Sequence, residues 1–269
     1  MKTIVLARPY GQTSNIFFQH VYFDSFCREH QIKFVNPFMH KYYKDYPQLN
    51  EYNRSWIADW STKKLVKKGL KFKLIKSVDF DNEGRKADYV NYILQGNKEK
   101  LFLEGWYFRH EDLVRKYRKV YQQLFAPDVN MADLQQRYLE RTDGQLLIGV
   151  HIRRGDYKEF LGGKYFYGDE VYVSKITELL AILNKKCRVI IFSNDTDLNK
   201  SVYHQHFGEV IISRNNVKTD HYLMSQCDYL IGPPSTFTMW ASFMGDKPVH
   251  FIESPAEKMM LEKFHIFFA

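Results

Sequence analysis

The second half of the chain alternates short apolar runs with segments of helical periodicity, and no other feature limits the fold as strongly. The apolar runs lack the polar alternation of a half-exposed strand, which is typical of strands in a parallel sheet covered on both faces. We expect strands at 146–152, 188–194, 209–213, 228–232 and 247–253, and helices at 170–186, 220–227 and 235–245, with a short helix after Asp197. This order of elements predicts an α/β fold.

The first half begins in the same way, but residues 41–100 show only weak periodicity. Its expected elements are strands at 2–7, 32–37 and 100–107, and helices at 14–30, 111–127 and 129–144. Such a β–α–β start is again an α/β signal. We therefore predict two domains, 1–135 and 136–254, with a C-terminal helix at 255–269 that packs back on the first.

Charge favours anionic partners without choosing among them. The chain has 39 Lys+Arg against 31 Asp+Glu, a net charge of +8. Nucleotides, phosphates, nucleic acid and an acidic membrane surface all suit such an excess. Residues 61–77 contain seven lysines, which suits either a solvated helix face or peripheral contact with a membrane. No familiar nucleic-acid motif is present, so no nucleic-acid partner is expected.

The cysteines predict neither a zinc site nor a disulfide framework. Cys27, Cys187 and Cys227 are far apart and odd in number. Reduced thiols favour a cytoplasmic protein. The apolar run near the N-terminus is too short for a signal peptide, and no stretch approaches the length of a transmembrane span. We expect a cytoplasmic location, with peripheral attachment at the inner membrane face as an option.

Polar groups follow four of the expected strands. They lie in 151–156, 193–195, 213–220 and 232–236. In a doubly wound sheet, ligands bind beyond the carboxyl ends of the strands. All four segments should therefore open on one edge of the sheet, and this convergence predicts a ligand site there.

Two adjacent arginines are the first candidates for that site. Arg153 or Arg154 could hold a diphosphate, because a guanidinium is permanently charged and forked. The alternative is an Arg–Asp pair that closes the loop, with Asp156 as partner. The other polar strand ends favour ligand binding.

Further candidates each have a simpler interpretation as helix caps. Ser235 and Thr236 open a helix, whose N-terminus also attracts anions. Asp220 is either a cap or an acceptor for the donor pair of guanine, which adenine lacks. Asn194 and Asp195 could cap the helix that follows them.

Two Asp-x-Asp triplets, 79–81 and 195–197, could hold a divalent ion on a diphosphate. So short a pattern arises often by chance. The first triplet is more typical of a turn and the second of a helix start, so no metal is expected.

The motifs resemble those of a known family. HIRRGDY (151–157) is similar to the His-x-Arg-Arg-x-Asp-Tyr motif of α-1,2-fucosyltransferases, and FSND (192–195) and 220–245 resemble their second and third motifs in order and spacing. SNIFFQ (14–19) resembles a degraded N-terminal segment of the family. The third motif departs from the pattern at Asp228, where histidine is common, and at Pro233 and Pro234, where asparagine is usual before Ser235.

The resemblance implies a GT-B fold, with two Rossmann-like domains and a cleft between them, and metal-independent inverting transfer from GDP-fucose. Arg153 would bind the β-phosphate, and His151 and Asp220 would lie on the guanine side. The remaining residues assigned to the donor are Arg154, Asn194, Asp195, Ser235, Thr236 and Phe237, with the serine and threonine on phosphate.

The resemblance also makes the first domain the acceptor side, where Asn15 and Gln19 are weak candidates, and Glu159 of the second domain is a third weak acceptor-side candidate. The catalytic base is left open among Asp156, Glu159 and a residue of the first domain.

Four functions remain in competition. The first is fucosyl transfer to O2 of a galactose-containing acceptor in bacterial-type surface polysaccharide or oligosaccharide synthesis. A lipid-linked acceptor is one option. The second is transfer with another linkage, acceptor or GDP-sugar. The third is a nucleotide- or glycan-binding protein without turnover. Adhesion through the tripeptide 154–156 is the least favoured, because it needs an exposed flexible loop.

Overall fold

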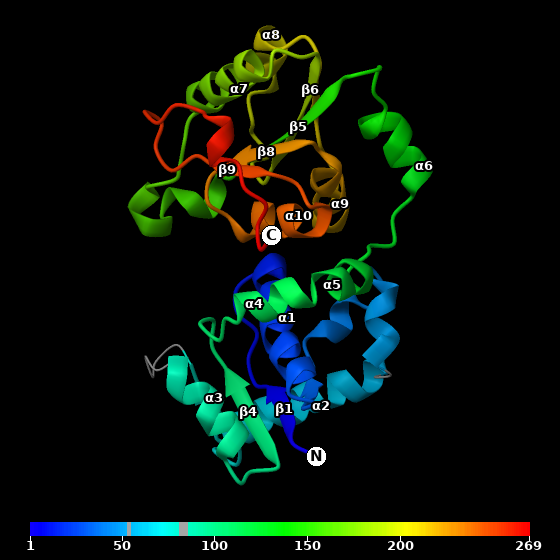
Figure 1. The fold of residues 1–269 in the computed structure, drawn as a ribbon, viewed down its shortest axis with the longest axis vertical. Coiled ribbons are helices and arrows are strands. Elements are labelled where there is room, and N and C mark those ends of the chain that lie inside the picture. Colours follow the sequence, from blue (N-terminus) through cyan, green and yellow to red (C-terminus); the bar gives the residue numbers. More distant parts are fainter. Residues whose placement is uncertain (53–54, 81–85) are drawn as a thin grey trace. The chain divides into compact units, whose positions relative to one another are not determined.

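The computed structural model describes residues 1–52, 55–80 and 86–269, except for the side chains of 50–52 and 86–88 (Figure 1). The chain divides into two compact units. The first unit is Met1–Asp128 with Phe268, and the second unit is Val129–Phe267 with Ala269. The sequence had suggested a boundary after residue 135.

The first unit is built on a four-stranded parallel sheet with the order β2-β1-β4-β3. Its strands are β1 (Thr3–Leu6), β2 (Lys33–Val35), β3 (Val78–Asp79) and β4 (Lys100–Glu104), and its α-helices are α1 (Thr13–Glu29), α2 (Trp56–Lys71), α3 (Lys86–Gln95), α4 (Glu111–Lys116) and α5 (Arg118–Leu124). Alternate residues of β1 face opposite sides: Ile4 packs with Phe23 of α1, whereas Val5 packs with Val66 of α2. The sheet is therefore covered on both faces.

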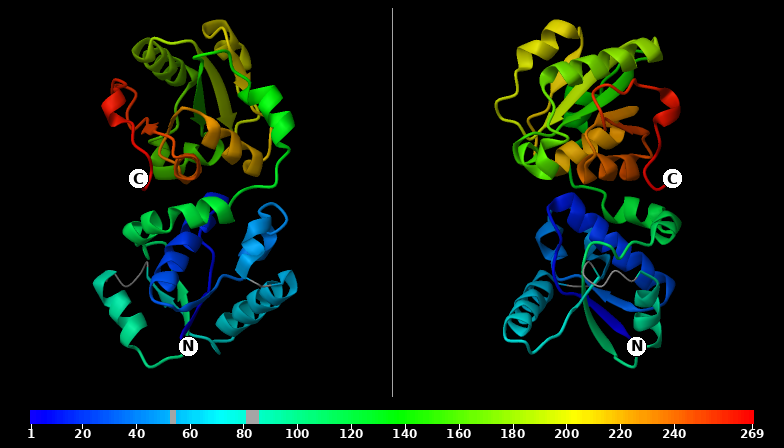
Figure 2. Two further views of the ribbon diagram at one scale, coloured as in Figure 1. Left: turned by 45° about the vertical axis from the view of Figure 1, so that its right-hand side comes forward. Right: turned by 90° about the vertical axis from the view of Figure 1, so that its left-hand side faces the viewer.

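The second unit contains a five-stranded parallel sheet with the order β7-β6-β5-β8-β9. Its strands are β5 (Leu146–Ile152), β6 (Cys187–Ser193), β7 (Val210–Ile212), β8 (Tyr229–Gly232) and β9 (Val249–Phe251), and its α-helices are α6 (Met131–Leu134), α7 (Asp169–Leu183), α8 (Lys200–His206), α9 (Val217–Gln226) and α10 (Thr236–Gly245). Strand β5 again separates two apolar clusters. Val150 packs in the cluster that contains Ile176 of α7, and Leu147 packs in the cluster that contains Leu223 of α9. Helices α7 and α9 therefore lie on opposite faces of this sheet (Figure 2).

All eight predicted strands lie close to their expected positions, whereas β3 within 41–100 was not predicted, and the helices differ more. The helix expected at 111–127 is interrupted at Tyr117, which separates α4 from α5. The helix expected at 129–144 is only the short α6, followed by a π-helical turn over Gln135–Leu139. No α-helix of the described residues is both long and apolar enough to cross a membrane.

The predicted C-terminal helix at 255–269 is wrong. This segment contains only a 3₁₀ turn, Leu261–Lys263, because its backbone groups bond elsewhere. His265 exchanges two hydrogen bonds with Val249 of β9, and the Phe267 amide donates to Oγ of Ser242 at 3.0 Å. Phe268 belongs instead to the first unit, where its carbonyl accepts from Arg118 at 2.9 Å.

Helices α9 and α10 pack so closely that one glycine is required between them. A Cβ atom at Gly245 would lie 2.0 Å from the carbonyl oxygen of Ser225. Backbone cannot move as easily as the end of a side chain, so any larger residue must force the helices apart.

We expect Gly245→Ala to lower the free energy of unfolding by about 1–3 kcal/mol, the usual cost of overpacking. Urea denaturation measures this change. Gly208→Ala is the matched control, because a Cβ atom at Gly208 meets no atom within 4 Å. Equal stability of the two variants would contradict the assigned helix contact.

Candidate functional site

The carboxyl edge of the second unit's sheet is the edge at which its strands end. Because all five strands are parallel, the four predicted polar segments open on this one edge, as expected. The chain leaves β5 towards β6 and later returns to form β8 on the other side of β5. Ligands of doubly wound sheets bind where the strand order reverses in this way. A ligand site is therefore expected at the segments after β5 and β8.

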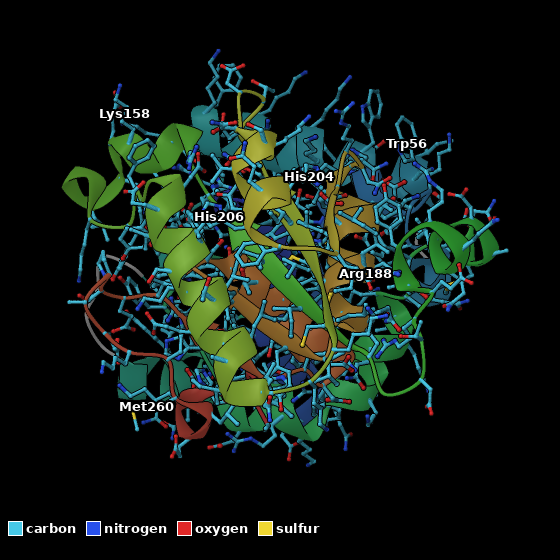
Figure 3. The ribbon with its side chains drawn as sticks, turned by 90° about the horizontal axis from the view of Figure 1, so that it is seen from above. Trp56, Lys158, Arg188, His204, His206 and Met260 are labelled. Atoms are coloured by element: carbon cyan, nitrogen blue, oxygen red, sulfur yellow. The ribbon has the colours of Figure 1, made fainter. Side chains whose placement is uncertain are left out.

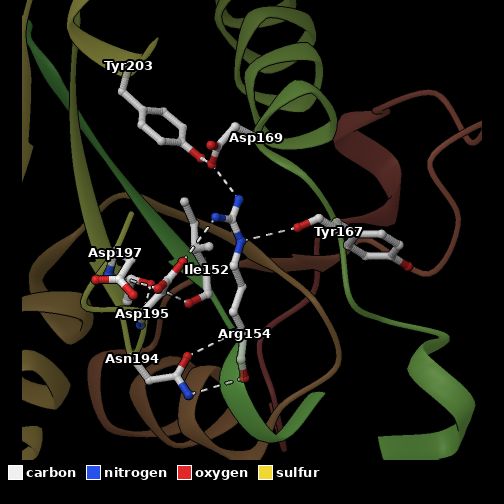
Figure 4. A network of polar contacts seen from close by, with 9 residues as sticks. Ile152, Arg154, Tyr167, Asp169, Asn194, Asp195, Asp197 and Tyr203 are labelled. Atoms are coloured by element: carbon white, nitrogen blue, oxygen red, sulfur yellow. Dashed lines mark hydrogen bonds and ion pairs between the residues drawn. The ribbon is translucent and has the colours of Figure 1, made fainter. Parts of the chain in front are cut away.

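Arg154 holds the segments after β5 and β6 together (Figure 4). Its guanidinium pairs with Asp195 at 3.0 Å and with Asp169, the first residue of α7. The hydroxyl of Tyr203 donates to the same Asp169 oxygen at 2.6 Å. Because only 14% of the arginine side chain is exposed, these carboxylates are well placed to compensate its charge.

Asn194 completes this network through the backbone of β5. Its Oδ1 accepts from the amide of Arg154 at 2.8 Å, and its Nδ2 donates to the carbonyl of the same residue at 3.3 Å. Asn194 and Asp195 do not cap the next helix, because α8 begins at Lys200 with Asn199 before it. Direct contact of Arg154, Asn194 or Asp195 with a donor stays a prediction; their observed contacts are within the protein.

The side chain of Asp195 in the second Asp-x-Asp triplet bonds within the protein. In the second triplet, Asp195 pairs with Arg154 and accepts from the amide of Asp197 at 2.9 Å. Asp81 of the first triplet lies outside the described residues. Within the described part of the chain, no group of three or more His, Cys, Asp or Glu residues could hold a metal ion.

Arg153 makes the ion pair that the sequence offered as the alternative to phosphate binding. Its Nε and Nη2 donate to the two carboxylate oxygens of Asp156 at 3.0 and 2.8 Å. The arginine side chain is 16% exposed, but that of Asp156 is 53% exposed. Asp156 is therefore occupied as an anchor, and its role as a base stays a prediction. Glu159, also exposed, follows in the same loop.

Tyr157 is a connecting residue to which the sequence analysis gave no role. Its hydroxyl donates to the carbonyl of Pro234 at 2.6 Å, and its ring lies 5.4 Å from the guanidinium of Arg153. This bond joins the loop after β5 to the loop before α10. The position of Tyr157 at the end of the HIRRGDY motif was the only signal for it.

The N-terminus of α10 lies directly after that joined loop. Ser235 is its N-cap, as predicted, and its hydroxyl accepts from the amide of Phe237 at 3.2 Å. Thr236 is the first helical residue and is half-buried. Free N–H groups and the helix dipole make such a terminus favourable for an anion.

Three aromatic rings pack against one another at tilted angles near this terminus. The ring of Phe237 lies between His151 and His221, with centroid distances of 4.8 and 4.2 Å. Nδ1 of His151 is 2.9 Å from Oγ1 of Thr238. Burial lowers the pKa of both histidines to about 3, so both rings are neutral at pH 7.

Asp220 is buried within α9 and does not cap it. Asn216 is the N-cap, and its Oδ1 accepts from the amide of Thr219. Only 9% of Asp220 is exposed, and the hydroxyl of Ser213 donates to its carboxylate. Burial raises the pKa of Asp220 to about 7, although the bond from Ser213 acts in the opposite direction.

Two of the acceptor-side candidates, Asn15 and Gln19, lie in the first unit, whereas Glu159 lies in the second. Gln19 is buried, and its amide accepts from Tyr10 N at 3.0 Å and donates to the carbonyls of Arg8 and Gly105. It therefore fixes the loops after β1 and β4. Asn15 lies in the first turn of α1, and its side chain occupies the space where a Cβ atom on Gly11 would lie. Direct contact of either residue with an acceptor stays a prediction.

The fold and this edge define a class. Parallel sheets in two units, with an anion-favouring strand end and helix N-terminus in the second, are the arrangement of a nucleotide-sugar transferase of the GT-B kind. A family model described as "Glycosyl transferase family 11" matches residues 15–263. The chain therefore belongs to glycosyl transferase family 11, which confirms the resemblance seen in its motifs.

Curated relatives match a smaller part of the chain. Galactoside alpha-(1,2)-fucosyltransferase 1 of Rattus norvegicus is 27% identical over 103 residues, which cover 36% of this chain and 27% of that protein. The Bos taurus protein of the same name is 28% identical over 112 residues, or 39% of this chain and 31% of that protein. The match thus spans about a third or less of each relative's length.

Solved structures share the fold over nearly the whole chain. A mutant of Arabidopsis thaliana FUT1 in complex with GDP has a TM-score of 0.62 at 12% identity, over 92% of this chain and 69% of that one. POFUT1 in complex with GDP has a TM-score of 0.55 at 10% identity, over 91% of this chain and 95% of that one. The fucosyltransferase NodZ from Bradyrhizobium has 0.52 at 14% identity, over 89% and 92%. The predicted GT-B-like class with two Rossmann-like halves is confirmed.

The raised pKa of Asp220 predicts a pH-dependent stability in the absence of ligand. A carboxyl group whose pKa is higher in the folded chain stabilises the fold while it is protonated, and this stability is lost as pH rises through about 7. We expect Asp220→Asn, which cannot ionise, to be more stable relative to wild type at pH 8 than at pH 5. Urea unfolding across this range measures the difference. Asp143→Asn, at an exposed position, should show no such trend.

Proposed function

We propose that this protein is a GDP-fucose-dependent glycosyltransferase that moves L-fucose to a hydroxyl group of a glycan. The observation that carries the proposal is the pairing, at the strand-order reversal, of Arg153 with the N-terminus of α10 through the bond from Tyr157 to Pro234. Two anion-favouring groups on neighbouring strand ends suit a diphosphate. Membership of glycosyl transferase family 11 supports the reaction class.

Asp220 supplies the preference for guanine in this proposal. Its carboxylate would accept from N1–H and the exocyclic amine, which adenine does not offer. Two relatives in fold, Arabidopsis FUT1 and POFUT1, were solved in complex with GDP, which supports the same nucleotide here. His151 and Phe237 would form the wall beside it, since their rings pack together with centroids 4.8 Å apart.

The proposed reaction is an in-line displacement with inversion. The acceptor hydroxyl attacks the anomeric carbon, the bond from that carbon to the β-phosphate oxygen breaks, and GDP leaves with the electron pair. Negative charge grows on the phosphate, where Arg153 and the α10 N-terminus, with Ser235 and Thr236, would stabilise it. No metal ion is required in this scheme.

Arg153 must exchange Asp156 for phosphate, or bind both, when the donor arrives. This exchange costs little free energy, because Asp156 is exposed and water can solvate the released carboxylate. Asp156 or Glu159 would then be free to accept the acceptor's proton, and a base from the first unit is the remaining alternative.

The acceptor in this proposal is a galactose-containing glycan, with O2 as the site of attachment. The names of the curated relatives support a galactoside and this linkage. We further propose that the acceptor is lipid-linked and serves bacterial-type surface polysaccharide or oligosaccharide synthesis, and that the protein works in the cytoplasm at the inner face of the membrane. Nucleic acid has no role in this scheme.

A second candidate is transfer with another linkage, acceptor or GDP-sugar, or binding without turnover. The departures from the family motif motivate it, but Asp228 carries little of that argument. Its carboxylate pairs with Arg141 at 2.8 Å and accepts from the amide of Leu147 at 2.8 Å, so it anchors the start of β5. Changes at Pro233 and Pro234, beside the proposed phosphate site, matter more.

A donor-by-acceptor activity screen, with product linkage determined by NMR, tests the proposal. We expect transfer from GDP-fucose to galactosides, full activity in EDTA, and thermal stabilisation by GDP but not by UDP. Activity that is lost in EDTA and restored by Mn²⁺ would overturn the metal-independent scheme. GDP-fucose binding without hydrolysis or transfer to any galactoside would favour the non-catalytic alternative.

Arg153→Ala should lower kcat by about 10²–10³, as expected for a lost transition-state donor. Steady-state kinetics measure this, with Arg137→Ala as control, since Arg137 makes a comparable ion pair with Asp133 on an exposed helix. Asp156→Asn separates the two roles of Asp156. An anchor should cost less than tenfold in kcat, whereas a base should cost about 10²–10⁴. Wild-type activity of Arg153→Ala would refute the phosphate assignment.

A further inference from the structure

Helix α2 of the first unit exposes large apolar side chains that its neighbours do not cover. Trp56 is 52% exposed, Ile57 67% and Leu65 69% (Trp56 is labelled in Figure 3). The helix reaches the sheet through its opposite face, where Val66 packs with Val5 of β1. Water therefore contacts large apolar side chains on the outward face. Such exposure is unfavourable in free energy unless a partner covers these side chains.

Residues at i, i+4 spacing form one stripe along this outward face. The rings of Trp56 and Trp60 stack with centroids 6.0 Å apart, and Nζ of Lys64 lies 3.6 Å from the centroid of Trp60. Lys68 and Phe72 continue the same spacing. The stripe thus has aromatic rings at both ends and ammonium groups in the middle.

A defined turn holds the second aromatic end outward. The amides of Leu74 and Ile75 both donate to the carbonyl of Gly69, at 2.8 and 3.1 Å, and Lys73 adopts a left-handed conformation with φ 57°. Ile75 packs where a Cβ atom on Gly69 would lie. With the backbone fixed in this way, Phe72 is 64% exposed and Leu74 82% exposed.

The charge of this surface is almost entirely positive. Residues 56–77 contain seven lysines and one acidic residue, Asp59. Asp59 is fully buried on the inner face, where Tyr43 donates to it, so it does not offset the lysines outside. Burial, followed by the charges of Lys67 and Lys41, lowers the pKa of Lys63, which indicates that cations crowd here.

We propose that the outward face of α2, together with the turn through Leu74, is a docking surface for an anionic lipid bilayer. Tryptophan, isoleucine, phenylalanine and leucine would enter the headgroup–acyl boundary at the two ends of the surface. The lysines between them would meet lipid phosphates, with their alkyl chains along the apolar region. A duplex nucleic acid would use the lysines but gains nothing from exposed Ile57, Leu65 and Leu74, so the bilayer is the better match.

This inference gives the proposed membrane location a surface but does not depend on fucosyl transfer. Vesicle flotation of the full chain, without donor or acceptor, tests it. We expect the protein to float with vesicles that contain phosphatidylglycerol, to bind vesicles of phosphatidylcholine alone at least tenfold more weakly, and to be released by high salt. Equal binding to both vesicles, or binding to neither, would overturn the proposal.

Two variants test the two chemical parts of the surface. The triple variant Lys64→Glu, Lys67→Glu, Lys68→Glu should bind anionic vesicles at least tenfold more weakly, because each lysine near such a surface strengthens binding about fivefold. The control variant Lys98→Glu, Lys185→Glu, Lys258→Glu makes the same change of charge at exposed positions elsewhere and should keep its binding. Equal loss in both would reduce the effect to net charge and refute a specific surface.

Depth of insertion is read from quenching of tryptophan fluorescence by brominated lipids. We expect wild type to be quenched and the variant Trp56→Phe, Trp60→Phe to lose most of the quenching while it still floats, since phenylalanine keeps the apolar contact. Unchanged quenching in this variant would refute insertion through α2. Tighter binding of the wild type to duplex DNA than to anionic vesicles would identify the surface as a nucleic-acid site instead. Activity on a soluble acceptor should be unchanged in all these variants, so this inference and the proposed reaction fail separately.

Discussion

Burial of β5 on both of its faces is the constraint on which the second unit depends. Ile148 and Val150 face one apolar cluster, and Leu147 faces the other. A strand in this position excludes charged side chains along its length, because a buried charge needs a partner. The chain can become strongly polar only after Ile152, and there it does so at once. The carboxyl edge of the sheet is the first point along β5 at which a charged side chain can reach water or a partner.

The two arginines at that point differ in ways that their sequence positions do not reveal. Arg154 is held between two largely covered carboxylates and bonds across to β6, so its position is fixed by the fold. Arg153 instead pairs with Asp156, whose side chain is 53% exposed. Replacing the carboxylate partner by another anion costs little free energy at Arg153 and much at Arg154. Arg153 is accordingly the arginine suited to a ligand that comes and goes, and Arg154 the one that keeps the edge in shape.

Much of this could be predicted from the sequence. Continuous apolar runs identified the strands, and the polar residues after them identified the edge, because parallel strands end together. Partners distant in sequence could not be predicted: Asp169 has the appearance of an ordinary helix start, and Gln19 serves backbone groups of two separate loops. The prediction of a C-terminal helix was wrong for a related reason, because hydrogen bonds from that segment to Val249 and Ser242 outweigh a local helical preference.

The bond from Tyr157 to Pro234 ends on a main-chain carbonyl rather than on a side chain. Every amino acid supplies that acceptor, including proline, which lacks only the donor. Position 234 can therefore change its side chain without losing the link between the two loops. A proline where the resembling family usually has asparagine alters what faces a ligand and leaves the framework beneath it in place. The side chains of this loop can thus vary while the bond that joins the two loops stays in place.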